Sequence, residues 1–552
     1  MDVGNEARRI RLRAAVASLV FGTAAIGNVD AAELPDQKGA AVAYVRVCSA
    51  EGVGFFYVPG TDTCLRVGGR ARFEYGVIGT ANRSTTNGDI SQYRGLLRLN
   101  LDARTQTDYG ILRAFVRLEL ASRTGSTPET SGTLQRFGAA FPGLGPDAYS
   151  RAQGYVQADK AFIQFAGLTA GRASSFYDFY AHDLEISRGS LGSDVSSTNL
   201  LAYTAKLAPG FSATVSMEDP LQRRQPVYAS GTATEAAPTA FGVFNPYGNA
   251  TAVAPIIVAR NAVGMPTVIA LEDATQKSRL PDFVGVARYD SDWGSTQVSA
   301  AIHEINGGNA AFLAGINGGT APAAANVPRS SSAYGWAVQA GIKINLPFIA
   351  PGDILYLQGS YGRGAESYTG IQQFRAGGLV SSVIFNGSPI QRYLVDAVVN
   401  PVNGKFDLSE SFTLVGALLH NWTPEWRSAV FASYGEARFG KADRYQLATI
   451  GFGLAPIFNS NGTINAANLA AFGYSNTLRD TSLIVAGASL IWSPVRDLDI
   501  GLEGEYVRAA LLQGVTNDAN KNPNGINVNG VPIRASSSAD TAQIRLRIIR
   551  DF

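Results

Sequence analysis

Nine arginines recur at alternate positions in four segments of the chain, and these residues could act on a charged solute. They are Arg66, Arg70, Arg72, Arg98, Arg104, Arg113, Arg117, Arg545 and Arg547. A guanidinium stays ionised at any physiological pH and carries five N–H donors that suit an anion. Gathered on one wall, these side chains would make a permanently positive surface.

A second set of charges lies in one segment, residues 176–197. Its carboxylates are Asp178, Asp183, Glu185 and Asp194. If this segment folds against the arginines, the opposed charges create a transverse field in the space between them. Such a field would orient dipolar solutes and exclude large apolar ones. The alternative is an ordinary exposed acidic loop.

Catalytic residues are sparse. The three histidines, His182, His303 and His420, lie in separate segments, whereas nucleophilic catalysis needs a base beside its nucleophile. The Gly-Lys pairs at 404–405 and 440–441 lack the following Ser or Thr of a phosphate-binding loop. We therefore expect no enzyme, no metal and no cofactor.

The segments that position the arginines alternate with a period of two. From 97 to 105 one parity is apolar, and the other carries Arg98 and Arg104. After a polar break at 107–110 the alternation resumes, which predicts two extended strands joined as a hairpin. In a soluble sandwich these arginines would face outward. In a membrane barrel the apolar face meets lipid and the arginines line a wet lumen.

Sixteen strands of this kind are predicted between residue 64 and the last residue. Their ranges are 64–77, the hairpin 93–123, 155–166, 168–174, 198–207, 211–219, 282–293, 295–305, 334–346, 353–364, 411–422, 426–437, 482–492, 497–509 and 539–552. The first must pair with the last to close a barrel, which joins all nine arginines into one stretch of wall.

The connections between these strands alternate between very short and long. The short ones centre on Gly or Pro, as at Gly110, Gly167 and Gly294. The long ones are 124–154, 175–197, 220–281, 306–333, 365–410, 438–481 and 510–538. This asymmetry is typical of outer-membrane barrels, with short periplasmic turns and long extracellular loops.

Strand length and aromatic placement also favour a membrane barrel. Strands of about nine or more residues can cross a hydrocarbon core when tilted. Aromatic residues lie near strand ends, as interfacial girdles require: Tyr75, Trp293, Tyr334, Trp336, Trp422, Trp426 and Trp492. The predicted fold is therefore an all-β, transmembrane, 16-stranded antiparallel β-barrel.

The N-terminus has the pattern of an export signal. Four arginines between residues 8 and 13 precede an apolar run at 14–26 that is too short to span a bilayer. Small residues at Val29 and Ala31 predict cleavage after Ala31; a buried helix of a cytosolic protein is the alternative. We therefore expect the chain to divide into a signal peptide (1–31), an N-terminal periplasmic segment (32–62) and the barrel (63–552).

Two further properties of the chain are its net charge and its two cysteines. The formal charge of +2 is too balanced to predict nucleic-acid binding. In an exported protein, the two cysteines, Cys48 and Cys64, favour a disulfide. Two free thiols or a metal site remain alternatives.

Five motifs resemble the alphaproteobacterial general-porin family. They are Tyr44–Cys48 (YVRVC), Phe56–Gly69 (FYVPGTDTCLRVGG), Ala161–Phe165 (AFIQF), Thr169–Arg172 (TAGR) and Ser175–Tyr180 (SFYDFY). The resemblance covers the chain up to about residue 220 and the terminal strands; the middle matches only in architecture. It implies a homotrimer in the outer membrane, in contact with membrane lipid and lipopolysaccharide. Each barrel would be a water-filled pore for small hydrophilic solutes, narrowed by an inward-folded third loop.

In such a pore we expect Arg70, Arg72, Arg98 and Arg117 to face the acidic loop. About half of the arginines should instead pair with Glu74, Asp102 and Glu119. The small residues Gly69 and Ala71 favour close approach of barrels at a trimer interface. The chain departs from the family in its long outer loops, notably 220–281 and 438–481. A receptor or adhesin acting through those loops is the alternative function.

Overall fold

A computed structural model of the chain contains the sixteen predicted strands, and every neighbouring pair among them is antiparallel. The strands are β2 (Cys64–Ile78), β3 (Ser91–Thr107), β4 (Gly110–Gly125), β5 (Ala152–Phe165), β6 (Leu168–Ala173), β7 (Thr198–Ala208), β8 (Phe211–Glu218), β13 (Asp282–Ser291), β14 (Gly294–Asn306), β16 (Ser332–Asn345), β17 (Ile354–Arg363), β20 (Glu410–Asn421), β21 (Trp426–Arg438), β22 (Thr481–Val495), β23 (Leu498–Leu511) and β28 (Ser538–Asp551). Because β2 pairs with both β3 and β28, the sheet closes into a barrel. The fold prediction is confirmed.

The structure describes residues 46–78, 91–125, 152–225, 227–228, 231–233, 251–262, 264, 266–273, 276–307, 311–315, 318–323, 327, 332–371, 390, 394–440, 478–517, 526–528, 531–533 and 535–552. The expected signal peptide and the first part of the expected periplasmic segment lie outside these residues. So does most of the long connection 438–481. Within the described part, no helix has both the length and the apolar character needed to cross a bilayer.

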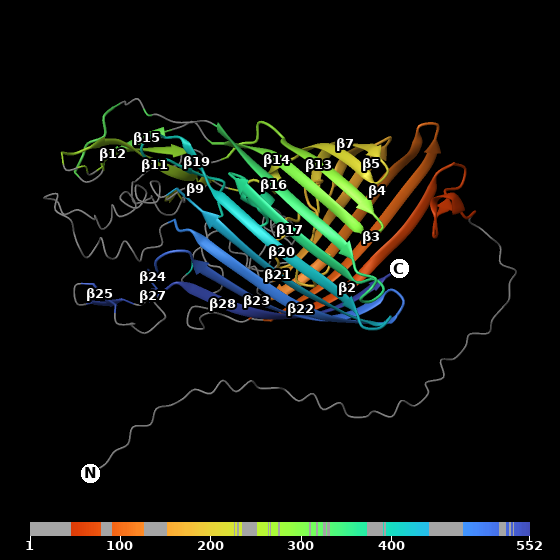
Figure 1. Ribbon diagram of the computed structural model, residues 1–552. Helices are drawn as coiled ribbons and strands as arrows, with labels where there is room; N and C mark the ends of the chain where they lie inside the picture. The colour runs from red at the N-terminus through yellow and green to blue at the C-terminus, as the bar shows by residue number, and fades with distance from the viewer. Residues whose placement is uncertain are drawn as a thin grey trace, which may run out of the picture. The chain divides into compact units, whose positions relative to one another are not determined.

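The strands lie side by side and tilted in Figure 1, with the C-terminus at the end where the short turns lie. The turn between β3 and β4 falls at Asp108 and Tyr109, inside the predicted polar break. At Gly294, which begins β14, φ is +145° and a Cβ would collide with the carbonyl of Lys343. Only glycine can therefore make this tight turn.

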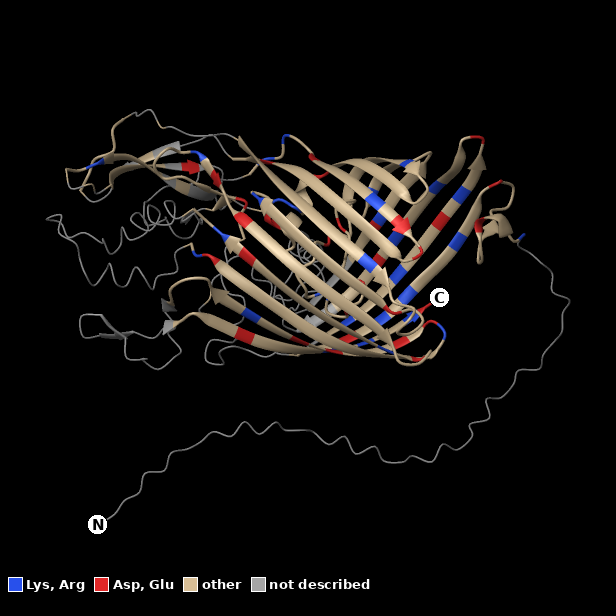
Figure 2. Cartoon of the chain, in the orientation of Figure 1, with Lys and Arg blue, Asp and Glu red and all other residues tan. Residues whose placement is uncertain are grey.

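One parity of each strand faces outward and is apolar. On β3 the side chain of Leu97 is 45% exposed, whereas that of the neighbouring Leu96 is buried. The opposite parity carries the charges, which recur along β2, β3 and β4 in Figure 2. In a membrane barrel this alternation places apolar side chains against lipid and charged ones in the lumen.

The described part of the N-terminal segment is fastened to the turn end of the barrel. A disulfide joins Cys48 to Cys64, the first residue of β2, across a sequence separation of 16. The strand β1 (Phe56–Tyr57) pairs with β2, and the 3-10 helix η1 (Ser49–Glu51) places Glu51 at 3.5 Å from Arg104. A closed loop of this length contributes about 3 kcal/mol by restricting the unfolded chain. The predicted disulfide is confirmed.

The long connections contain strands that the sequence pattern missed. One four-stranded sheet comprises β10 (Gly231–Ala233), β11 (Thr251–Arg260), β12 (Pro266–Asp273) and β15 (Ala311–Gly315). A three-stranded sheet comprises β9 (Val227–Tyr228), β18 (Ala397–Val399) and β19 (Phe406–Leu408). The remaining short elements are η3 (Pro220–Gln222), α2 (Glu366–Thr369), β24 (Thr516–Asn517), β25 (Ile526–Val528), β26 (Val531–Ile533) and β27 (Ala535–Ser536).

These outer sheets share a core with the barrel. Ile256 of β11, Ala270 of β12 and Val399 of β18 are buried in one cluster with Ile305 of β14. In Figure 1 the labels β11, β12 and β15 lie beyond the end opposite the C-terminus. The long connections therefore add packed structure at the loop end of the barrel.

Candidate pore constriction

The segment between β6 and β7, residues 174–197, crosses the lumen; we call it the inner loop. Its backbone bonds to side chains on strands spread around the barrel. The contacts are Phe176 N–H to Glu218 of β8 (3.1 Å), Tyr177 C=O from Gln339 of β16 (3.0 Å), Tyr180 N–H to Gln358 of β17 (2.9 Å), Leu191 N–H to Ser433 of β21 (3.1 Å), Ile186 N–H to Glu503 of β23 (2.7 Å), and Ser196 C=O from Lys160 of β5. A loop that reaches all these strands must fold inward.

Irregular backbone inside a barrel needs partners for its N–H and C=O groups. Here polar side chains on the lumen face of the strands supply them. Gly189 lets the loop approach the wall closely, because a Cβ there would collide with the Glu505 carboxylate. Gly192 lets the loop pack on itself, because a Cβ there would lie 2.9 Å from the carbonyl of Tyr180. The expectation of an inward-folded acidic loop agrees with this geometry.

Three of the four loop carboxylates are held by nearby partners. Glu185 accepts hydrogen bonds from the Tyr180 hydroxyl (2.8 Å) and the Ser190 N–H (3.0 Å), and lies 3.2 Å from His182 Nδ1. Burial opposes a charge on His182, but the Glu185 carboxylate outweighs it and raises the pKa of His182 above 6.5. Burial likewise opposes ionisation of Glu185, yet His182 and Ser190 lower the pKa of this carboxyl below 4.5. The two groups form a buried ion pair.

Asp178 and Asp194 are paired with arginines outside the predicted basic wall. Asp178 accepts a hydrogen bond from Arg223 at 2.7 Å, and Asp194 lies 2.9 Å from Arg188. The fourth carboxylate, Asp183, is exposed. Asp183 is therefore the loop carboxylate most open to solvent.

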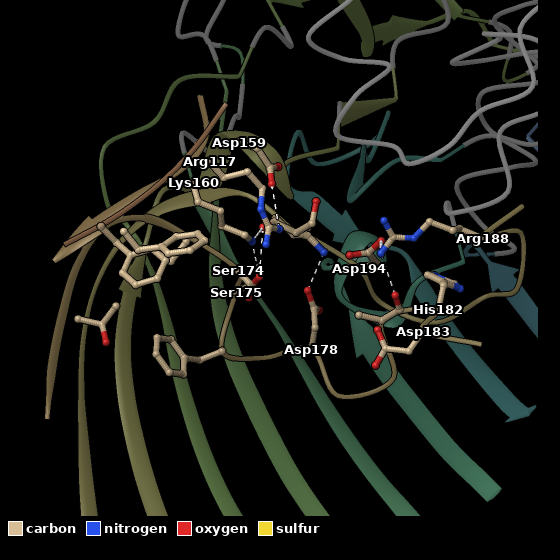
Figure 3. A pocket seen from close by; sticks show the side chains of 18 of the residues that line it. Arg117, Asp159, Lys160, Ser174, Ser175, Asp178, His182, Asp183, Arg188 and Asp194 are labelled. Atoms are coloured by element: carbon tan, nitrogen blue, oxygen red, sulfur yellow. Dashed lines mark hydrogen bonds and ion pairs between the residues drawn. The ribbon is translucent and has the colours of Figure 1, made fainter. Parts of the chain in front are cut away.

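One cavity of about 870 Å³ brings the two predicted sets of charges together. Figure 3 shows Arg117 and Lys160 on one side of it, with Asp178, His182 and Asp183 on the inner loop. The wall contributes Arg70, Arg72, Arg98, Arg113, Arg117 and Arg547, and the loop contributes Asp178, Asp183, Glu185 and Asp194. In all, nine Lys and Arg side chains line this cavity against six Asp and Glu.

A second cavity of about 530 Å³ continues along the same wall. It is lined by Arg66 and Arg104, and it shares five lining residues with the first: Arg70, Arg98, Arg113, Phe115 and Arg117. Hollow space therefore extends past the inner loop along the arginines. Of the nine predicted arginines, Arg545 alone lines neither cavity; it is buried on β28.

Five of the nine arginines pair with the three expected wall carboxylates. The pairs are Arg72–Glu74 (3.8 Å), Arg547–Glu74 (2.9 Å), Arg98–Glu119 (2.5 Å), Arg104–Asp102 (2.9 Å) and Arg113–Asp102 (2.8 Å). Arg70 pairs instead with Asp551 at 2.6 Å. Arg117 donates to Asn100 at 2.8 Å and lies 3.5 Å from Asp159. Seven of the nine guanidiniums are thus each held by a polar partner.

Comparison with known proteins identifies the family. The model of the porin subfamily matches residues 35–527. The chain belongs to this porin subfamily. It is similar to porin Omp2b of Brucella suis biovar 1 (strain 1330), with 32% identity over 218 residues, which are 37% of this chain and 54% of the relative. Porin Omp2b of Brucella melitensis biotype 1 is 31% identical over the same length. The chain thus spans about half the length of these curated relatives.

Solved structures of similar architecture include the outer membrane channel DcaP of Acinetobacter baumannii and an anion-selective porin from Comamonas acidovorans. The first is 12% identical with a TM-score of 0.49, over 90% of this chain and 99% of that one. The second is 10% identical with a TM-score of 0.37, over 89% and 100%. Family and barrel together place this porin in the outer membrane.

Five charged residues of the lumen and inner-loop region of this porin were not predicted from the sequence. Arg288 on β13, Glu503 and Glu505 on β23 lie at the polar parity of strands that were predicted, so the alternation could have found them. Lys160 was hidden by a β-bulge, because pairing shifts between Arg117 and the next residue and Asp159 becomes an extra residue on β5. Arg223 lies in a long connection, where no alternation of apolar and polar residues indicates which way a side chain points.

Each of the three histidines of the porin contacts a different acidic residue. His182 is in the inner loop, Nδ1 of His303 lies 2.7 Å from Asp282, and Nδ1 of His420 lies 2.6 Å from Asp353. Among the described residues, no group of three or more His, Cys, Asp or Glu side chains could hold a metal ion.

Proposed function

We propose that the barrel is a water-filled outer-membrane channel for passive diffusion of small hydrophilic solutes and ions. One observation carries this proposal. The inner loop narrows the lumen, yet two cavities that share part of the basic wall continue past it. A lumen filled for a purely structural role would leave no such hollow space along its most charged wall.

The selectivity of the channel follows from the arrangement of its charges. Low-dielectric walls concentrate the field of the arginines on a passing ion. Nine basic against six acidic side chains around the larger cavity make its lining net positive. We therefore expect anions to be favoured, with Asp183 opposing them from the inner loop.

Single-channel recording in a planar bilayer tests both statements. Purified protein should give large ohmic steps, whereas a receptor or adhesin barrel with a filled lumen should give none. Arg72→Gln with Arg117→Gln should shift the reversal potential in a salt gradient toward cations, and Asp183→Asn should shift it toward anions. Both shifts should shrink near 1 M salt, where the screening length falls to about 3 Å.

The control is Arg363→Gln, because Arg363 pairs with Glu410 at 3.3 Å and is half exposed at the loop end of β17. It should leave the reversal potential unchanged. If the variants give ohmic steps but their reversal potentials at low salt equal that of the wild-type protein, these residues do not form the constriction.

We propose further that the porin is a homotrimer in contact with membrane lipid and lipopolysaccharide. The observation in favour is Ala71, a small exposed residue on the apolar face of β2. The neighbouring Gly69 contributes less than expected, because its Cβ position is covered by the ring of Phe552. The interface proposal therefore rests on Ala71.

A further inference from the structure

The lumen wall carries an aromatic pair inside the basic patch. Phe115 of β4 and Phe162 of β5 are register partners, and their rings stack with centroids 5.3 Å apart and an interplanar angle of 29°. Both side chains are half-buried, and both line the larger cavity. An apolar surface is thus presented to the lumen between charged residues.

Rows of polar side chains flank the aromatic pair on both sides. On one side the register pairs Arg117 with Lys160, and on the other it pairs Arg113 with Gln164. All four residues line the same cavity. Successive rows on one face of a sheet are about 7 Å apart, so one small solute can contact the aromatic row and a cationic row together.

The arginines are already orientated around the rings. The Arg113 guanidinium carbon lies 5.1 Å from the centroid of Phe115 and 5.6 Å from that of Phe162. The Arg117 guanidinium carbon lies 5.5 Å from the centroid of Phe115. Asp102 and Asn100 hold these two arginines by hydrogen bonds of 2.8 Å each. A solute therefore meets a preformed group and does not have to order it.

We propose that this patch, defined by Phe115, Phe162, Arg113, Arg117 and Lys160, is a binding site for small monocyclic aromatic carboxylates. The ring packs on the two phenylalanines, and the carboxylate accepts hydrogen bonds from the cationic row. An aliphatic anion uses only the cations, and a neutral aromatic solute uses only the rings. The site deepens the proposed channel function, on which it rests, by naming a solute class that the lumen retains.

The experiment measures block of the chloride current through single channels by benzoate, acetate and benzamide. In the wild-type protein benzoate should reach half-block at a concentration between about twofold and about tenfold below that of acetate, the range that one aromatic contact contributes. Neutral benzamide should block less than benzoate. Equal half-block by benzoate and acetate overturns the proposal.

The decisive variant is Phe115→Leu with Phe162→Leu, which keeps apolar volume and removes the aromatic faces. The advantage of benzoate over acetate should fall, while block by acetate stays unchanged. Phe283→Leu is the matched control, because Phe283 is exposed on the outward face of β13. It should behave as wild type.

The experiment distinguishes failure of the proposed channel function from failure of the proposed binding site. Absence of conductance steps in the wild-type protein refutes the channel itself. Normal steps with an unchanged benzoate advantage in the double variant refute the aromatic site alone. If the double variant gives no channels, Phe162→Leu by itself gives the same comparison.

Discussion

Glu503 should control whether the inner loop stays docked across the lumen. Its carboxylate accepts hydrogen bonds from the N–H groups of Ile186 (2.7 Å) and Ser187 (2.6 Å), and a third from the Ser187 hydroxyl. It is 1% exposed, so water cannot replace these bonds. No other described carboxylate binds two successive N–H groups of this loop.

The magnitude follows from the number and type of these bonds. A hydrogen bond to a charged group contributes about 1.5–3 kcal/mol, and an unsatisfied buried donor is costly. Glu503→Ala removes the acceptor of two N–H groups, so the ratio of released to docked loop should rise at least about a hundredfold, at tenfold per about 1.4 kcal/mol. Glu503→Gln keeps a neutral acceptor, and because charge-assisted bonds are roughly twice as strong as neutral ones, a rise of about tenfold is expected.

A substitution at Glu505, in contrast to those at Glu503, should not weaken docking of the inner loop. The single hydroxyl hydrogen of Ser187 faces carboxylates of both Glu503 and Glu505. Glu505→Gln replaces one of these two carboxyl groups and supplies an N–H donor to the Ser187 oxygen. It should hold the loop at least as firmly as the wild-type protein does.

The assay is the open-channel noise and closure frequency of single channels at fixed voltage. The Glu503 variants should show graded increases, and Glu505→Gln should show none. Equal noise in Glu503→Ala and the wild-type protein would refute the view that this carboxylate anchors the loop. If Glu503→Ala forms no channels, the milder Glu503→Gln tests whether this carboxylate anchors the loop.

Two further predictions concern pH and assembly. The pKa of His182 is raised and that of Glu185 is lowered. The stabilisation from this ion pair is therefore complete at pH values between the ordinary pKa values of the two groups. It is lost as pH rises through the raised pKa of His182, or as pH falls through the lowered pKa of Glu185. Closure frequency should therefore rise at alkaline pH, and His182→Gln should flatten that limb; a wild-type closure frequency independent of pH would contradict this. Ala71→Arg should weaken the trimer on unheated gels, since a charge on the lipid face is costly, and an unchanged trimer band would argue against this interface.

The barrel could be predicted because its strands obey one local rule. Leu97 and Arg98 lie on opposite faces whichever strands pair with β3, so a period of two gives the direction of each side chain before the fold is known. Closure followed from chemistry, since an open sheet would leave unpaired backbone groups in lipid. The strands of the outer sheets, such as β11 and β12, could not be found this way. They pair edge to edge in one sheet, and their buried residues share a cluster with Ile305. Residues 252–259 of β11 are apolar throughout, so the sequence shows no alternation of apolar and polar residues there.

The charges of the wall and their pairing with Glu74, Asp102 and Glu119 were predictable, whereas the pairings of the inner loop were not. Parity placed Arg98 and Arg113 in the lumen, but it gave no way to see that Asp178 binds Arg223, a residue of a long connection. Nor could it show that Glu185 is satisfied within its own loop. Partners of a loop depend on where its backbone runs, and that path is set by side chains on distant strands.

The paired state of the wall explains how so many arginines can serve a channel. An isolated guanidinium on a flexible side chain would swing toward each passing anion and hold it, which slows permeation. Here Glu119 holds Arg98, and Asp102 holds both Arg104 and Arg113, so the donors left over keep fixed directions. Each carboxylate cancels part of the neighbouring charge. In the proposed channel an anion would therefore be attracted strongly enough to enter and weakly enough to leave, the condition that conduction requires. The inner loop meets the same condition by keeping most of its acids paired and leaving Asp183 exposed.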